Sequence, residues 1–171
     1  MNSSDAQFPE ATVNLYPKTR ILVGIGEARW TSTPGQVLVA RSIGSSGALA
    51  LWDPFGTAGG MLHWLVPDAD CDPERAISRP GLFADTGIPL LLRGMESLGA
   101  DLENLQAVLA GAASLREGGE MDVGARNRET AYGCLKRNGI HVTREETGGF
   151  CVRELSLEIG SGRTCIRCQQ L

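Results

Sequence analysis

A glycine-flanked serine and a histidine in the following apolar segment form the most reactive pattern in the chain. Ser46 lies in Gly44-Ser45-Ser46-Gly47, directly before an apolar run, and His63 lies in Gly59-Gly60-Met61-Leu62-His63-Trp64. A hydroxyl at a strand start with a histidine base on a neighbouring strand is the minimal pair for covalent hydrolysis. The small neighbours leave room for a substrate, and their backbone N–H groups can stabilise an oxyanion. Taken alone, such a histidine is more often a hydrogen-bonded core residue.

A second reactive pattern lies near the C-terminal end, where Cys165 and Cys168 have the Cys-x-x-Cys spacing. A zinc site normally needs a second pair of ligands, and the chain has two histidines, His63 and His141. A redox pair would open a helix, whereas this segment is typical of a strand. A structural or incidental role is favoured, and a redox or zinc protein is kept as an alternative. The five cysteines, odd in number and scattered, predict reduced thiols and no disulfide framework.

Length and composition exclude several classes of function. A chain of 171 residues with a net charge of −4 predicts one domain and gives no basic field for nucleic acid. The N-terminus has no signal-peptide pattern, and no stretch approaches the ~18 continuous apolar residues of a membrane helix. Gly24-Ile25-Gly26 lacks the third glycine of a dinucleotide site, because position 29 is arginine. We therefore expect a cytoplasmic protein without membrane insertion, and no cofactor or metal.

The elements that must position Ser46 and His63 follow from apolar runs and turn residues. Residues 1–18 are expected to be a loose arm, and residues 19–171 one domain. Apolar runs predict strands at 21–23, 36–41, 48–52, 61–66, 105–110, 140–143, 152–159 and 163–168. Helical periodicity predicts one helix capped by Asp85 or Thr86 and ended by Gly99, with Pro89 in its first turn, and another from about Asp122 to Asn138. The fold class is α+β, a single domain of mixed β-sheet layers packed against two main helices.

Several short motifs occur in a fixed order along this pattern. They are Gly24-Ile25-Gly26-Glu27, Ile43-Gly44-Ser45 with Asp53-Pro54, Gly60-Met61-x-His63 with Leu65-Val66-Pro67, Phe83-Ala84-Asp85, Ala110-Gly111-Ala112-Ala113, Gly124-Ala125-Arg126-Asn127, and Thr147-Gly148-Gly149 with Arg153. On these motifs, the segment from about Ile21 to Arg167 resembles the CheD chemoreceptor glutamine deamidases of bacterial chemotaxis. The resemblance implies a fold similar to the catalytic domain of cytotoxic necrotizing factor.

The resemblance also implies a mechanism and a set of site residues. In the family a cysteine thiolate attacks a receptor glutamine, a histidine is the base, and a threonine orients the histidine. His63 matches the base, but Ser46 stands at the cysteine position and Ala40 at the threonine position, six residues earlier. Gly47 replaces the usual β-branched residue after the nucleophile. The motifs place substrate binding at Gly44, Ser45, Arg126, Asn127, Gly148, Gly149 and Arg153.

Two departures at catalytic positions leave three hypotheses open. The favoured one is a CheD-like protein with impaired catalysis that binds chemoreceptor cytoplasmic helices or a CheC-type phosphatase, partners that the resemblance implies. The alternative is an active Ser-for-Cys glutamine deamidase, natural or engineered. Cys151, near Gly148 and Gly149, is a less favoured source of a displaced thiol. The third hypothesis is the redox or zinc protein that uses Cys165 and Cys168.

Overall fold

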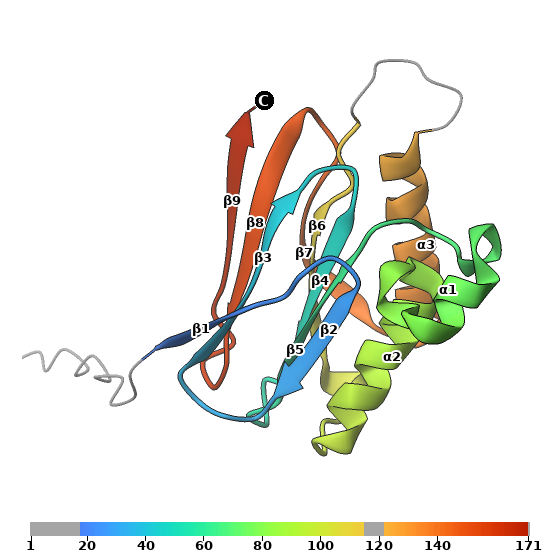
Figure 1. Ribbon diagram of the computed structural model, residues 1–171. Coiled ribbons are helices and arrows are strands. Elements are labelled where there is room, and N and C mark those ends of the chain that lie inside the picture. The colour runs from blue at the N-terminus through green and yellow to red at the C-terminus, as the bar shows by residue number, and fades with distance from the viewer. Residues whose placement is uncertain (1–17, 115–121, 171) are drawn as a thin grey trace, which may run out of the picture.

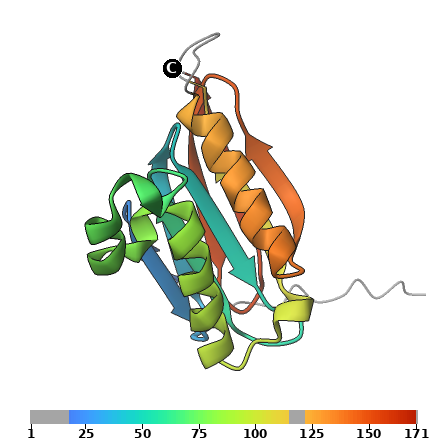
Figure 2. The same ribbon diagram turned by 90° about the vertical axis from the view of Figure 1, so that its right-hand side faces the viewer.

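Two β-sheets and a layer of helices stack on one another (Figure 1). The computed structural model describes residues 18–114 and 122–170. One sheet has the strand order β1-β3-β8-β9, and the other has the order β2-β5-β4-β6-β7. The strands are β1 (Thr19–Leu22), β2 (Glu27–Thr31), β3 (Gln36–Ile43), β4 (Gly47–Trp52), β5 (Gly59–Trp64), β6 (Gln106–Gly111), β7 (His141–Thr147), β8 (Cys151–Glu158) and β9 (Thr164–Gln170). Helices α2 (Ala84–Ser97) and α3 (Val123–Arg137) cover the outer face of the five-stranded sheet (Figure 2).

The central strands of the five-stranded sheet are apolar on both faces because both faces are covered. Leu49 of β4 and Leu62 of β5 belong to a core cluster shared with α2 and α3. Ala50 and Met61 belong to a second cluster, which lies against the four-stranded sheet. Side chains alternate between the two faces of a strand, so each strand contributes to both clusters. This double burial accounts for the continuous apolar runs in the sequence.

The two main helices begin differently. The N-cap of α2 is Phe83, which makes no side-chain capping bond, so the expected cap at Asp85 or Thr86 was wrong. Asp85 instead accepts a hydrogen bond from the Ala69 backbone N–H at 3.0 Å. Pro89 consequently lies inside the helix and not in its first turn. The expected start of α3 near Asp122 is confirmed, because the Asp122 carboxylate accepts from the Ala125 N–H at 3.1 Å.

The predicted α+β class, with one domain, mixed sheet layers and two main helices, is confirmed. The sequence patterns missed β2, a half-exposed strand, and the short helix α1 (Pro73–Ser78), which lies in a segment read as irregular. Three 3₁₀ turns complete the described elements: η1 (Ala69–Cys71), η2 (Pro80–Leu82) and η3 (Leu102–Asn104). The expected arm at residues 1–18 lies outside the described residues apart from Lys18.

Strand register brings several of the glycine-containing motifs to one end of the sandwich. Gly47 at the start of β4 pairs with Trp64 at the end of β5 and with Gly111 at the end of β6. Gly111 in turn pairs with Thr147 at the end of β7. The N-terminus of α3 lies at the same end, since Gly124 packs on the carbonyls of residues 112 and 113. We call this region the site end; it is the upper end in Figure 1.

Candidate functional site

Ser46 and His63 meet at the site end as the spacing predicted. Ser46 precedes β4, and His63 lies on β5 opposite Ala48. A hydrogen bond of 3.1 Å joins Ser46 Oγ and His63 Nε2, and the exposed fractions of the two residues are 5% and 1%. The pair is therefore placed for proton transfer between the hydroxyl and the imidazole.

The environment of His63 favours its neutral form. Burial lowers the pKa of the imidazole below its ordinary value, and the backbone of Val23 opposes this shift only in part. A neutral imidazole can accept the proton of a hydroxyl, which a protonated one cannot do. His63 thus has the charge state that a general base requires at neutral pH.

The second imidazole nitrogen has only weak support for the role of a base. Among residues 18–114 and 122–170, no group meets the buried His63 Nδ1 in full hydrogen-bond geometry, and the ring's polar support is the Val23 backbone, whose hydrogen bond raises the pKa of the imidazole. Ala40, at the position where the resemblance implies a threonine, is fully buried on β3 in the cluster between the two sheets. Its methyl group offers no hydrogen-bond acceptor. Within the described residues, no side chain therefore selects the tautomer of His63, and the selection rests on the Val23 backbone alone.

The end of β6 holds the backbone around Ser46. The Ala112 N–H donates to the Ser46 carbonyl at 2.7 Å, and the Ala113 N–H donates to the Gly44 carbonyl at 2.9 Å. Gly111 has a φ of +104°, and a Cβ there would lie 2.4 Å from the Ser46 carbonyl oxygen. Only glycine allows this approach of one backbone to the other.

The α3 residues assigned to substrate binding make internal contacts instead. Asn127 has an exposed fraction of 0% and donates from Nδ2 to the carbonyls of Ser45 at 2.8 Å and Leu65 at 3.0 Å. Its Oδ1 accepts from Trp64 Nε1 at 3.0 Å. Both N–H groups of its amide are thus used within the protein, and the substrate-binding assignment of Asn127 stays a prediction. Arg126 pairs with Asp68 at 2.6 Å on the surface.

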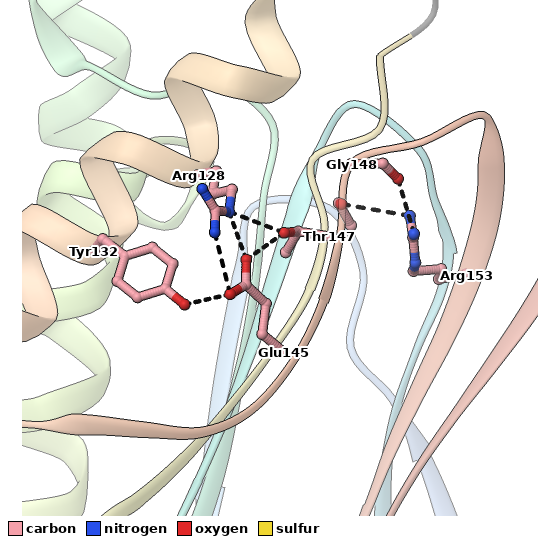
Figure 3. Close-up of polar contacts among 7 residues, drawn as sticks. Arg128, Tyr132, Glu145, Thr147, Gly148 and Arg153 are labelled. Atoms are coloured by element: carbon pink, nitrogen blue, oxygen red, sulfur yellow. Dashed lines mark hydrogen bonds and ion pairs between the residues drawn. The ribbon is translucent and has the colours of Figure 1, made fainter.

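The turn between β7 and β8 carries the remaining predicted residues. Arg153 Nη2 donates to the Gly148 carbonyl at 2.8 Å, and Nη1 makes a longer contact of 3.5 Å to the Gly111 carbonyl (Figure 3). Its buried Nε has no partner among the described residues, and burial lowers the pKa of the guanidinium. The Gly149 carbonyl accepts from the Ser114 N–H at 3.0 Å. Arg153 therefore supports the turn next to Ser46; the substrate role of this turn remains a prediction.

Beside this turn is a polar cluster that the sequence analysis did not find. Arg128 of α3 forms an ion pair with Glu145 of β7 at 2.5 Å, and Glu145 also accepts from Tyr132 and Thr147 (Figure 3). These bonds lower the pKa of Glu145 to about 2, with Arg128 as the first cause. The cluster borders an open hollow of about 580 Å³. It joins residues from α3 and β7, and no short spacing in the sequence marks it.

The cysteines differ from expectation. Cys151 at the start of β8 and Cys168 on β9 form a disulfide, with Cα atoms 6.1 Å apart. Five reduced thiols were therefore a wrong prediction, and a displaced catalytic thiol at Cys151 is ruled out in this state. Cys165 is free and exposed, and Cys168 is bonded to Cys151, so Cys165 and Cys168 do not form a disulfide with each other in this state. Within the described ranges, no three metal-binding side chains come together.

Large apolar side chains are exposed in the chain segments that border the site end. We call Ile25, Leu65, Val123 and Phe150 the apolar rim; their exposed fractions are 43%, 43%, 39% and 51%. Each adjoins a residue that contacts the site end: for example, the Gly26 N–H donates to the His63 carbonyl at 2.7 Å. Phe55, which is 83% exposed, lies in the turn between β4 and β5 at the opposite end. No described helix has the length and apolarity to span a bilayer.

Comparison with known proteins identifies the family. The model described as CheD chemotactic sensory transduction matches residues 65–168. The chain is 39% identical over 148 residues to "Probable chemoreceptor glutamine deamidase CheD 2" of Anaeromyxobacter dehalogenans, covering 86% of this chain and 93% of the relative. It is 36% identical over 146 residues to "Chemoreceptor glutamine deamidase CheD" of Thermotoga maritima, covering 85% and 90%.

A likeness to a solved structure is weaker. The crystal structure of the Bacillus licheniformis hypothetical protein YfiH is 14% identical with a TM-score of 0.42. The match covers 69% of this chain and 49% of that one, so this chain spans about half of YfiH, and we draw nothing from it. The family model and the relatives, which span most of the chain, are decisive: the chain belongs to the CheD family.

Proposed function

We propose that this CheD-family protein acts on chemoreceptors by binding their cytoplasmic helices at the site end, with little or no glutamine deamidation. The names of the relatives supply the activity and its target. The observation that carries the loss of activity is that no side chain of the described residues bonds the buried His63 Nδ1, so that only the Val23 backbone supports the ring. That nitrogen is where an orienting group would act on the base.

The chemistry of serine makes the reaction rate depend strongly on the orienting group that is missing here. In a deamidation through Ser46, Oγ would attack the carboxamide carbon while its proton passes to His63 Nε2 and then to the leaving ammonia. Water would then hydrolyse the ester to give glutamate. A serine needs a base that takes its proton during attack, whereas a cysteine near a histidine is already partly ionised. Loss of the orienting group from such a system costs ~10⁴ in rate.

The tautomer of His63 decides whether the pair is productive. Proton transfer from Ser46 requires that Nε2 be unprotonated and that Nδ1 carry the hydrogen. The opposite tautomer donates from Nε2 to Ser46 Oγ and blocks the transfer, while giving the same 3.1 Å contact. With the methyl group of Ala40 at the orienting position, the productive form gains no stabilisation there.

A second candidate function is deamidation by Ser46 itself, and one observation favours it. The oxygen and nitrogen already lie at 3.1 Å, and burial keeps His63 neutral. A serine enzyme would need little further rearrangement for the first proton transfer.

Ammonia release from a chemoreceptor fragment separates the two candidates. We would compare the natural protein with Ser46→Cys, Ser46→Cys with Ala40→Thr, and the same double variant with His63→Ala as the inactive control. Deamidation by the double variant, with turnover by the natural protein at least ~10³ lower, supports the proposal. Turnover by the natural protein at the level of the double variant would establish the serine enzyme.

Binding is tested at the apolar rim. Large exposed apolar groups around a site are typical of protein-binding surfaces. Phe150→Ser and Leu65→Ser should each weaken binding to a receptor cytoplasmic fragment by about tenfold or more, as expected for central apolar contacts. Phe55→Ser at the opposite end is the matched control and should bind as the natural protein does. Equal affinity of all four proteins would contradict docking at the site end. A CheC-type phosphatase is the second partner to assay with the same variants.

A further inference from the structure

Asn127 connects the helix layer to both halves of the Ser46–His63 pair. It lies on α3, is completely buried, and makes three side-chain hydrogen bonds. Two go from Nδ2 to the carbonyls of Ser45 and Leu65, and the third comes to Oδ1 from Trp64 Nε1. Ser45 precedes the hydroxyl residue, and Trp64 and Leu65 follow the histidine. One side chain thus binds the main chain beside each member of the pair.

Trp64 adds a second connection at the same place. Its ring lies against Gly47, where a Cβ would come 2.1 Å from the ring carbon Cζ2. Gly47 follows Ser46 directly, so Ser46 is flanked by a residue that Asn127 binds and a residue that Trp64 covers. The ladder between β4 and β5 begins only at Gly47, so the direction of the Ser46 side chain depends on these contacts together with the bonds from Ala112 and Ala113 of the main chain after β6.

We propose that Asn127 is a positioning residue that sets the separation and orientation of Ser46 Oγ and His63 Nε2. An amide suits the task because it donates to two carbonyls and accepts from the indole N–H at once. Aspartate would present oxygen to both carbonyls, and alanine would leave two carbonyls and the indole N–H buried without partners. Either change releases the Ser45–Ser46 peptide from α3.

The two histidines allow a direct test in the natural background. The inference concerns the pair on which the proposed function rests, but its measurements need no chemoreceptor. The role of Asn127 and the proposed function can therefore each fail without the other. We would follow the imidazole signals of Asn127→Ala by NMR across a pH titration, with exposed His141 as the internal reference. The titration midpoint of His63 should rise toward its ordinary value as water reaches the loosened pair.

A second readout uses the thiol of Ser46→Cys. A cysteine held against His63 has a lowered pKa, and its alkylation can be followed at that residue by mass spectrometry. Adding Asn127→Ala should raise this thiol pKa and slow alkylation at pH 7 about tenfold for each unit of the rise. Thr130→Ala is the matched control: it lies on the same helix and removes the bond to Asp68, but does not contact the pair. It should change neither readout.

The outcome that overturns the proposal is a folded Asn127→Ala protein whose His63 titration and Ser46→Cys alkylation match those of its parent or shift equally in Thr130→Ala. Should Asn127→Ala fail to fold, Trp64→Phe serves in its place, since it removes one of the three bonds and keeps a ring over Gly47. A smaller shift of both readouts in the same direction supports the proposal, and unchanged readouts refute it.

Discussion

Trp64 and His63 are neighbours on β5 whose side chains point to opposite faces of one sheet, and their polar atoms differ in how fully they are hydrogen-bonded. On the helix side, the Trp64 indole and the Asn127 amide satisfy each other and two carbonyls. On the side between the sheets, no described residue meets His63 Nδ1 or Arg153 Nε in full hydrogen-bond geometry, and the Val23 backbone supports the imidazole only in part. A buried polar atom without a partner costs ~1–3 kcal/mol, so the two sides contribute oppositely to stability.

The difference indicates what each side does. Fully bonded networks hold geometry, and that of Asn127 holds the loop bearing Ser46. Unpaired buried groups mark functional sites or positions where a partner has been lost. His63 fits both descriptions, because it faces a reactive hydroxyl on Nε2, and Ala40 stands at the position where the resemblance implies a threonine. The polar groups that stabilise the fold therefore lie on the helix side of β5, and the groups that could take part in a reaction lie on the side between the two sheets.

The largest expected effect is the loss of Trp64. Trp64→Ala removes a completely buried ring and one of the three Asn127 bonds, so the free energy of unfolding should fall by ~3–5 kcal/mol in urea denaturation. Trp64→Phe keeps most of the volume and should cost ~1–3 kcal/mol, mainly through the unpaired Asn127 oxygen. If the two variants are equally stable, the hydrogen bond contributes nothing and the contrast between the sides fails.

The dependence of the free energy of unfolding on pH should separate the contribution of Glu145, which contacts α3, from that of His63, which lies between the two sheets. The pKa of Glu145 is about 2 in the folded protein, below its ordinary value of 4.5, so its contribution is complete above about 4.5 and disappears as the pH falls toward 2. The contribution should be on the order of 1–2 kcal/mol, because solvent screens half-exposed Arg128. Glu145→Gln should flatten the stability curve in that window, as measured by urea unfolding at each pH.

The pH range in which His63 affects the free energy of unfolding lies above that of Glu145. Its folded pKa is below 6.5, so the unfolded chain takes up the proton first, and stability is complete above about 6.5 and declines as the pH falls. Each unit of this lowering corresponds to about 1.4 kcal/mol. Glu145→Gln should leave this upper window intact; flattening of both windows by that one change would contradict the assignment.

A smaller effect is expected when the unpaired group itself is removed. In a Ser46→Ala background, where no hydroxyl loses its histidine partner, His63→Leu fills the same buried position without a polar atom, so the stability at pH 8 should stay within ~1 kcal/mol of Ser46→Ala or increase. The decline that begins near pH 6.5 should disappear in the same variant. A loss above ~2 kcal/mol at pH 8 would show that Nδ1 is bonded in solution and that the two sides do not differ as described.

The sequence allowed the prediction of features that depend on local pattern. Apolar runs located most strands, and Asp122 with the following apolar positions located α3. The Ser46–His63 pair was predictable because glycine flanks and strand register act over short stretches. The half-exposed strand β2 and the short α1 gave patterns too weak to distinguish them from loops.

Features that depend on tertiary contacts were not predictable. Arg126-Asn127 stood out as a motif, but only the fold shows that Asn127 faces inward to Ser45 and Trp64. Cys168 was read with Cys165, its neighbour in sequence, whereas strand pairing places it beside Cys151. The Arg128–Glu145 pair likewise depends on how α3 lies over β7.

The smallest effect on stability is expected at Ala40, where the change bears most directly on chemistry. Ala40→Thr should place a hydroxyl between the sheets near His63, and a bond to Nδ1 worth ~0.5–1.5 kcal/mol should offset much of the crowding from the added atoms. Ala40→Val has nearly the same shape without the hydroxyl and is the matched control.

The imidazole ¹⁵N shifts report which nitrogen carries the hydrogen, and so measure the effect directly. In Ala40→Thr the population of His63 with hydrogen on Nδ1 should rise. The free energy of unfolding of Ala40→Thr should exceed that of Ala40→Val by the contribution of one hydrogen bond. Equal shifts and equal stability in the two variants would mean that position 40 does not reach the ring. The missing orienter would then have to be sought elsewhere along β3, and the contrast between the two faces of β5 would no longer explain a weak base.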